Sequence, residues 1–178
     1  MKILITGRPG IGKTTVVKKL AACSSPIAGG FLTEEIRRQG RRVAFGVRDL
    51  HSGKQGVLAH VDRTDGPRVG KYVVDVASFD RVATAALRGA ARRPGCVVID
   101  EIGRMELNSK AFREMLEAIL DSGRPLVATI PVHRHPLLDR LRNRSDVTLI
   151  EVTASNRDEL PQRLAKLLGL SHSGAPAR

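Results

Sequence analysis

The sequence predicts a three-layer α/β fold, in which helices cover both faces of a mostly parallel central sheet. From residue 96 to residue 168, short apolar runs alternate with helix-like segments, and this alternation is typical of parallel strands joined by crossover helices. Between Ala28 and Val61 the pattern changes to strand-like runs separated by short turns. That change predicts an antiparallel β-meander of about three strands, inserted near one edge of the sheet.

The expected elements follow from local patterns along the chain. The apolar run Lys2–Thr6 stops at a glycine and predicts a strand, and the next apolar residues, in Thr14–Ala22, have helical spacing. Strands are expected in the meander at Gly30–Ile36, Val43–Leu50 and Gly56–Val61, with a short one at Tyr72–Val74 after a patternless loop at Asp62–Gly70. Later strands are expected at Cys96–Ile99, Leu126–Ile130 and Val147–Val152. Helices are expected at Val76–Arg92, Ser109–Leu120, His135–Leu141 and Ser155–Leu168.

Length and charge limit the class of protein. With 178 residues, the chain fits one domain, which we expect over residues 1–168, followed by a flexible tail at 169–178 rich in glycine, serine and proline. Thirty Lys and Arg against eighteen Asp and Glu give a net charge of +12. The basic residues lie in short clusters, and the chain has no Trp and one Tyr. A solvated surface is therefore favoured over a nucleic-acid site.

Other features point to a protein that works in the cytoplasm. No apolar run approaches the roughly 18 residues that a membrane helix needs, so no membrane partner is expected. The two cysteines, Cys23 and Cys96, lie in apolar surroundings without metal-ligand spacing, which is typical of buried thiols in a reducing compartment. His133 and His135 lack a third ligand nearby, so a metal site there is disfavoured. The oligomeric state stays open.

The strongest motif is GRPGIGKT at Gly7–Thr14, between a predicted strand and a predicted helix. This pattern is a phosphate-binding loop, in which glycines let successive backbone N–H groups point at phosphate oxygens. Lys13 is expected to reach the β- and γ-phosphates, and the Thr14 hydroxyl to ligate Mg²⁺. Thr15 is expected at the helix start near the α-phosphate, although a plain packing role is nearly as consistent with its position.

A second motif follows the apolar run that begins at Cys96. The run ends in Asp100 and Glu101, and the carboxyl end of a parallel strand would place these two acids beside the phosphate-binding loop. We assign Asp100 to Mg²⁺, directly or through a water, and Glu101 to orienting and polarising the water that attacks the γ-phosphate. The next residues continue this edge, where Gly103 permits a sharp turn.

Together these segments resemble a family of small nucleoside-triphosphatases that includes the human cancer-related nucleoside-triphosphatase and relatives from thermophiles. Besides the phosphate-binding loop, the resemblance rests on the segments GGFLTEEIR, GPRVGKYVVD, VVIDEIGRMEL, LVATIP and NRDEL. It implies a RecA/AAA-like phosphate-loop fold. In this fold one strand lies between the phosphate-loop strand and the strand that ends in Asp100 and Glu101, the DE strand. It also implies slow hydrolysis of NTPs to NDP and phosphate with broad base tolerance. The residues then expected to face the nucleotide are Gly7, Arg8, Pro9, Gly10, Ile11, Gly12, Lys13, Thr14, Val97, Val98, Ile99, Asp100, Glu101, Ile102, Gly103 and Arg104.

Five further residues are weaker candidates. Arg68, or its neighbour Lys71, is a candidate cation for the transition state because glycines and a proline shape the loop around it. A solvated basic loop fits equally well. Asn156 and Arg157 are expected at the start of the last helix, as an N-cap and a solvated arginine or as contacts to the base. Thr129 is a candidate γ-phosphate sensor, with β-branched strand packing as the alternative.

Glu34 and Glu35 are expected to be structural, with one side chain on each face of their strand. The residues favour an Mg²⁺-dependent NTP phosphohydrolase, in which Lys13, Glu101 and Arg68 are the catalytic candidates. The alternatives are a small-molecule or nucleotide kinase, and a nucleotide-dependent switch associated with nucleic acid.

Overall fold

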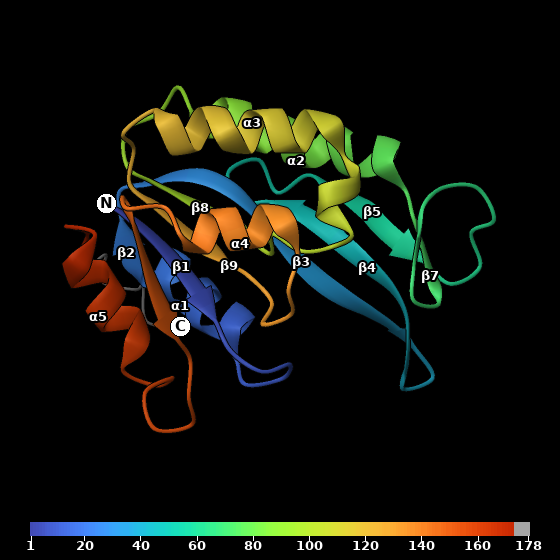
Figure 1. Cartoon of the computed structure of the whole chain (residues 1–178), viewed down its shortest axis with the longest axis horizontal. Coiled ribbons are helices and arrows are strands. Elements are labelled where there is room, and N and C mark those ends of the chain that lie inside the picture. Colours follow the sequence, from blue (N-terminus) through green and yellow to red (C-terminus); the bar gives the residue numbers. More distant parts are fainter. Residues whose placement is uncertain (173–178) are drawn as a thin grey trace.

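The computed structural model describes residues 1–172, and these form the expected three layers (Figure 1). A nine-stranded sheet has the order β10-β1-β9-β8-β3-β4-β5-β7-β6. The helices α2, α3 and α4 cover one face, where their apolar side chains form the larger core, and α1 and α5 cover the other. In this part of the chain, no helix is both long and apolar enough to cross a bilayer.

The parallel half of the sheet carries the phosphate-loop topology. Strand β1 (Lys2–Thr6) pairs in parallel with β10 (Val147–Glu151) on one side and β9 (Leu126–Thr129) on the other. Strand β9 in turn pairs in parallel with β8 (Cys96–Asp100). One strand therefore separates the phosphate-loop strand from the DE strand, which confirms the RecA/AAA-like order.

The long strand β3 (Ile27–Arg38) joins this half to an antiparallel extension. Its first half pairs in parallel with β8, and its second half pairs antiparallel with β4 (Arg41–Asp49), which continues to β5 (Gln55–His60). The meander is thus confirmed, but β3 begins three residues before the expected Gly30. Gly29 and Gly30 have φ values of 127° and 122°, and a Cβ atom on Gly30 would lie 1.8 Å from the Val98 carbonyl oxygen. Gly30 thus permits the close approach of β8, whereas a Cβ atom on Gly29 would lie 3.5 Å from the Ala90 Cβ, and both glycines lie within the strand and not in a turn.

The remaining elements close the two helical layers. They are α1 (Lys13–Cys23), β7 (Tyr72–Val74), α2 (Val76–Ala90), a 3₁₀ turn at Glu106–Asn108, α3 (Lys110–Asp121), α4 (Pro136–Arg142) and α5 (Leu160–Leu167). Helices α2 and α3 begin at side-chain caps, because Asp75 and Ser109 accept hydrogen bonds from the amides of Ser78 and Phe112. Three rings, Phe31, Phe79 and Phe112, pack edge to face beneath α2 and α3, with centroids 5.4 to 5.7 Å apart.

Three sequence expectations need correction. The loop 62–70 contains a two-residue strand, β6 (Arg68–Val69), which pairs with β7 at the sheet edge. Helix α5 starts at Leu160, five residues later than expected, because turns occupy residues 154–159. The segment expected to be a flexible tail contains β11 (Ser171–His172), which pairs with β2 (Ser24–Ser25). Residues 173–178 of that tail lie outside the described part of the chain.

Candidate active site

The glycine-rich loop connects β1 to α1 as expected. Gly7, Gly10 and Gly12 have φ values of 145°, 76° and 112°, which glycine adopts without strain. Gly12 is the N-cap of helix α1, which therefore has no side-chain cap, and the first turn has no acidic residue. Its first amides and the positive end of its dipole are therefore directed at the loop, an arrangement that favours phosphate.

Lys13, Thr14 and the two acids meet beside this loop. The Lys13 ammonium donates to the Gly7 carbonyl at 3.1 Å and lies 3.7 Å from the Glu101 carboxylate. The Thr14 hydroxyl donates to Asp100 Oδ1 at 3.2 Å, although 86 residues separate the two in the chain. The structure therefore brings together Lys13, Thr14, Asp100 and Glu101.

Asp100 is fully buried, and only one of its two carboxylate oxygens has a hydrogen-bond partner among the described residues. The Thr129 hydroxyl, on β9, donates to the same Oδ1 at 2.6 Å, whereas Oδ2 is buried without a hydrogen-bond partner among the described residues. Burial raises the pKa of Asp100, against the hydrogen bonds from Thr129 and Thr14 that lower it. Thr129 therefore does more than pack as a β-branched strand residue, because its hydroxyl is bound to Asp100. It orients the carboxylate.

The pair Thr14 and Asp100 fits a magnesium ion. Mg²⁺ prefers hard oxygen ligands and is usually held by one or two protein groups together with substrate phosphates and waters. A threonine hydroxyl beside a buried carboxylate whose second oxygen has no partner supplies such a donor set.

Glu101 has a different environment from its neighbour. Its side chain is partly exposed and lines a cavity of about 720 Å³. Burial also raises its pKa, and the nearby Lys13 ammonium opposes that shift. A carboxylate that faces open space beside the phosphate-binding loop is placed to accept a proton from a small nucleophile.

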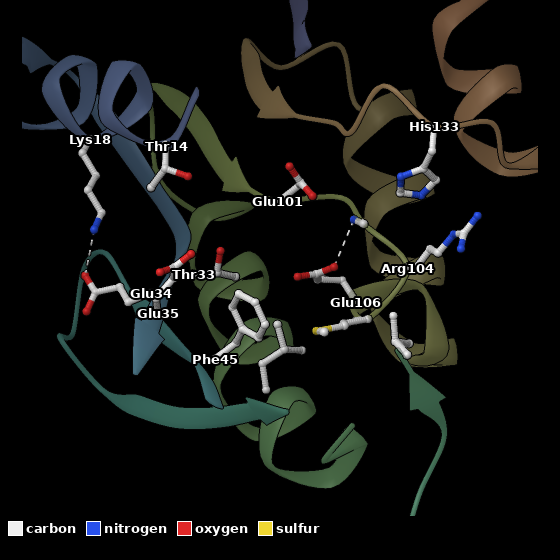
Figure 2. Close-up of a pocket in the computed structure, with 14 residues that line it drawn as sticks. Thr14, Lys18, Thr33, Glu34, Glu35, Phe45, Glu101, Arg104, Glu106 and His133 are labelled. Atoms are coloured by element: carbon white, nitrogen blue, oxygen red, sulfur yellow. Dashed lines mark hydrogen bonds and ion pairs between the residues drawn. The ribbon is translucent and has the colours of Figure 1, made fainter. Parts of the chain in front are cut away.

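The cavity lies between the antiparallel extension and the carboxyl end of β8 at Asp100 and Glu101, which we call the DE edge (Figure 2). Figure 2 shows Glu101 between Thr14 and His133, with Glu106 and Phe45 below it in this view, and all five residues line the cavity. A smaller concavity of about 250 Å³ lies at the start of α1 and is lined by Gly10, Ile11, Gly12, Thr15, Val16, Lys19, Arg157 and Asp158.

Several residues that were expected at the site lie elsewhere in the structure. Val97, Val98, Ile99 and Ile102 are fully buried in the two cores and line neither concavity, so their side chains are scaffold and the expectation that they face the nucleotide is not met. The reason is that β8 is covered on both faces. Arg8 and Pro9 are exposed in the loop, whereas Gly103 and Arg104 line the larger cavity.

Arg68 is not brought to the acids. It lies exposed on the edge strand β6 and is not among the residues that line the cavity, although its neighbour Val69 is. The Lys71 ammonium lies 5.4 Å from the Tyr72 ring centroid. Arg104, which directly follows the DE edge, lines the cavity and forms no ion pair with any described residue.

Asn156 is structural, but it is not the expected N-cap. Its amide closes the turn after β10, accepting from the Thr153 amide and donating to the Glu151 carbonyl, both at 2.9 Å. Arg157 lies beside the phosphate-binding loop, where a Cβ atom on Gly12 would be 3.9 Å from its Cδ. It also lines the smaller concavity.

Glu34 and Glu35 are held in ion pairs. Glu34 pairs with Lys18 and Arg48, and Glu35 with Arg37 and Arg42. Both line the larger cavity, where one was expected to face away. Cys96 is buried as expected, and burial raises the pKa of its thiol to about 12. Cys23 is only partly buried.

Two charged residues of the cavity were missed by the sequence-based predictions. Glu106 is 5 % exposed, and its Oε2 accepts a hydrogen bond from the Gly103 amide at 3.0 Å. Lys18 lies one turn after Thr14 on α1 and pairs with Glu34 at 3.2 Å. The helical spacing of Thr14 and Lys18 was a usable signal for Lys18, whereas no local pattern marks Glu106 as buried.

Comparisons with known proteins agree with this geometry. The family model described as NTPase matches residues 2–165. The nucleoside-triphosphatase THEP1 of Thermotoga petrophila is 44 % identical over 168 residues, covering 94 % of this chain and 93 % of that protein. The same-named protein of Thermofilum pendens is 48 % identical over 169 residues, covering 92 % of each.

Solved structures give the same result. The crystal structure of THEP1 from Aquifex aeolicus has a TM-score of 0.85 and 39 % identity, and covers 94 % of this chain and 99 % of that chain. The solution structure of a human cancer-related nucleoside triphosphatase has a TM-score of 0.76 and 38 % identity, and covers 93 % and 96 %. The chain belongs to the nucleoside-triphosphatase family.

Proposed function

We propose that this protein is an Mg²⁺-dependent phosphohydrolase that converts nucleoside triphosphates to diphosphates and inorganic phosphate. The observation that carries the proposal is the cluster of Lys13, Thr14, Asp100 and Glu101 at the uncapped start of α1. The family name of the relatives supports the same reaction class.

Each of the four residues has a role that its surroundings support. The glycine loop and Lys13 hold the phosphates, and Lys13 exchanges its contact with the Gly7 carbonyl for the β- and γ-phosphate oxygens. Thr14 and Asp100 would hold Mg²⁺, which would supply neutralisation of phosphate charge when bound. Thr129 fixes the Asp100 carboxylate.

The hydrolytic step uses Glu101. Its carboxylate accepts a proton from water as the water oxygen bonds to the γ-phosphorus, and the bond to the β–γ bridging oxygen breaks. The nucleoside diphosphate leaves with that electron pair. For the additional cation, Arg104 is better placed than Arg68, because Arg104 lines the cavity beside Glu101.

Broad base tolerance follows from the smaller concavity, to which we assign the nucleoside. Its lining combines backbone of the loop with charged and aliphatic side chains, and contains no aromatic ring. Without a stacking platform and a fixed hydrogen-bond pattern, discrimination between bases is weak.

The charge placement favours no nucleic-acid partner. Several members of the basic clusters are neutralised within the fold, since Arg37 and Arg42 pair with Glu35, Arg142 with Asp139, and Arg144 with Asp146. An ion-paired surface attracts phosphate backbones less than a stripe of unpaired cations. We place the protein in the cytoplasm because its thiols, Cys23 and Cys96, are unpaired.

The test is phosphate release from ATP, GTP, CTP and UTP, each with Mg²⁺ and with a chelator. We expect release from all four that the chelator abolishes. Lys13→Ala is the matched variant and should lose nucleotide affinity and turnover while keeping its thermal unfolding midpoint, because the lost interaction is with the ligand. Unchanged release by that variant contradicts the proposal.

A further inference from the structure

The cavity beside Glu101 is much larger than hydrolysis requires. A water molecule takes about 30 Å³ of liquid volume, whereas the cavity measures about 720 Å³. That volume is within the range of about 300–1,000 Å³ that is typical of sites for small organic ligands. The space therefore admits a second reactant as well as a water.

The cavity lies on the γ-phosphate side of the site. Thr14 and Glu101 form part of its lining, whereas the residues of the smaller concavity follow the loop toward Thr15 and Lys19 on the other side of α1. A nucleotide that has its nucleoside in the smaller concavity directs its terminal phosphate at the larger one. This placement rests on the proposed function.

The far wall of the cavity is apolar. It is made by Phe45 and Leu58 of the antiparallel extension, by Val69 of the edge strand β6, and by Met105 of the turn after the DE edge. An aromatic ring, a thioether and two aliphatic side chains favour a ligand with an apolar body.

Apart from Glu101 and Arg104, whose charges are opposite, the polar groups around that wall carry little net charge. Glu34 and Glu35 at the rim are neutralised by their ion pairs. Burial raises the pKa of Glu106 to about 8, so this carboxyl is mostly protonated at neutral pH. Burial and the neighbouring Arg104 and Arg142 lower the pKa of His133, which is therefore neutral.

His133 also offers an unused hydrogen-bonding atom. Its Nε2 is buried without a partner among the described residues, and the residue lines the cavity opposite Thr14 (Figure 2). Its loop is held by Arg142, which donates to the His133 carbonyl at 3.3 Å and also to the Pro131 carbonyl. A buried polar atom without a partner is costly unless a ligand or water satisfies it.

We propose that this cavity binds a small neutral alcohol with an apolar body, and that the hydroxyl of this alcohol accepts the γ-phosphoryl group in place of water. The hydroxyl lies against Glu101 and the body lies against the wall of Phe45, Leu58, Val69 and Met105. The protein is then a phosphotransferase whose hydrolysis is the reaction without an acceptor.

The transfer step balances without another reactant. The alcohol oxygen bonds to the γ-phosphorus while its proton passes to the Glu101 carboxylate. The bond between the γ-phosphorus and the β–γ bridging oxygen breaks, and the nucleoside diphosphate leaves with the electron pair. The products are a phosphate monoester and NDP.

The experiment measures how the phosphoryl group partitions between alcohol and water. The full chain is incubated with γ-labelled ATP, Mg²⁺ and either benzyl alcohol or glycerol, and labelled monoester and inorganic phosphate are separated. We expect the ratio of benzyl phosphate to inorganic phosphate to exceed the mole ratio of benzyl alcohol to water by at least about tenfold, the scale of weak pocket discrimination. Glycerol, which lacks an apolar body, should show a smaller excess.

A matched pair of variants locates the acceptor. Val69→Trp fills part of the cavity and should lower the transfer excess about tenfold or more. Ile36→Trp places the same side chain on an exposed position of β3 that does not line the cavity, and should keep the excess. If Val69→Trp fails to fold, Met105→Trp in the turn after the DE edge replaces it and should lower the transfer excess in the same way.

The outcomes separate the two proposals. Release of inorganic phosphate with a benzyl phosphate ratio no higher than the mole ratio overturns the acceptor site and leaves the hydrolase intact. A glycerol excess equal to that of benzyl alcohol, or an excess that survives in both tryptophan variants of the cavity, also overturns it. No release of label under any condition overturns the proposed hydrolysis itself.

Discussion

Glu101 and its neighbour Asp100 are adjacent in the chain, but the two carboxylates have different surroundings. Asp100 is fully buried and receives hydrogen bonds from Thr14 and Thr129, whereas Glu101 is partly exposed and lines the cavity. A buried acid fixed by two hydroxyls suits a metal ligand, and an acid that faces open space suits proton transfer.

This difference predicts distinct effects of the two amide variants. Glu101→Gln keeps the side-chain shape but cannot accept a proton, so we expect kcat to fall on the order of 10²–10⁴ with near-normal binding of ATP·Mg²⁺. Asp100→Asn should instead raise the Mg²⁺ concentration needed for half-maximal activity. Single-turnover kinetics and nucleotide titration check both variants. If Glu101→Gln weakens binding and spares kcat, the two roles are wrongly assigned.

Glu106 predicts how stability depends on pH. Burial, with nearby Glu101 and Asp100, raises its pKa from 4.5 to about 8 in the folded chain. Between these values the folded state binds more protons than the unfolded state, so the free energy of unfolding falls as pH rises, by at most about 1.4 kcal/mol per pH unit. Below that window both states are protonated, and above it both are ionised.

The variant Glu106→Gln removes this titration. It keeps an oxygen that can accept from the Gly103 amide and has no charge to bury. Relative to the unmodified chain, its urea midpoint should therefore rise progressively from about pH 5 to about pH 8. Parallel pH curves for the two proteins would show that Glu106 is not the group responsible.

At the scale of elements, the edge strand β6 and the turn after β8 both offer a cation. Arg68 on β6 was expected from the shape of its loop, but Arg104 follows the DE edge and lines the cavity. We expect Arg104→Ala to lower kcat by at least about tenfold, which is modest beside the 10³–10⁵ of a well-placed arginine finger. Arg68→Ala and Lys71→Ala, measured beside it, should change kcat less. A fall confined to Arg68 would mean that β6 closes over the phosphates.

The elements that sequence patterns predicted well are those that local residues determine. The strand β1, the glycine loop and the start of α1 form one short stretch, in which every turn residue and apolar residue agrees with the structure. The start of β3 was missed because Gly29 and Gly30 have the composition of a turn, and the need for glycine at Gly30 comes from the approach of the Val98 carbonyl on β8. β6 and the late start of α5 were missed for another reason, because β6 belongs to a two-residue hairpin pairing with β7 and α5 follows a turn closed by Asn156, and neither has an apolar periodicity.

The residues of the candidate site were likewise predictable only where a local sequence pattern marks them. The acids of the DE edge were predictable because they end an apolar strand, but the hydroxyl that fixes Asp100 comes from Thr129 on the neighbouring strand. Glu106 was not predictable, because its burial and its hydrogen bond from the Gly103 amide arise in an irregular turn without apolar periodicity. The apolar wall of the cavity is made by side chains of β4, β5 and β6 together with Met105 from the turn after β8. No local sequence pattern connects these four segments.

At the scale of the whole molecule, the parallel and antiparallel halves of the sheet have different tasks. The parallel half holds the phosphate-binding loop, the acids and Thr129, and the antiparallel half, from β4 to β6, contributes side chains only to the far wall of the larger cavity. A nucleotide held as we propose therefore contacts the first half and leaves the second untouched.

This division predicts where a bound nucleotide slows amide hydrogen exchange. With Mg²⁺ and a non-hydrolysable ATP analogue, peptides covering residues 7–15 and 100–104 should exchange more slowly, because the ligand accepts from loop amides and joins the two segments through the metal. Peptides covering the hairpin of β4 and β5 should be unchanged. Lys13→Ala should show no slowing at either place. Equal slowing in the hairpin would mean that the nucleotide itself fills the larger cavity, and the nucleoside would then have to be reassigned from the smaller concavity at α1 to the space that we give to the acceptor.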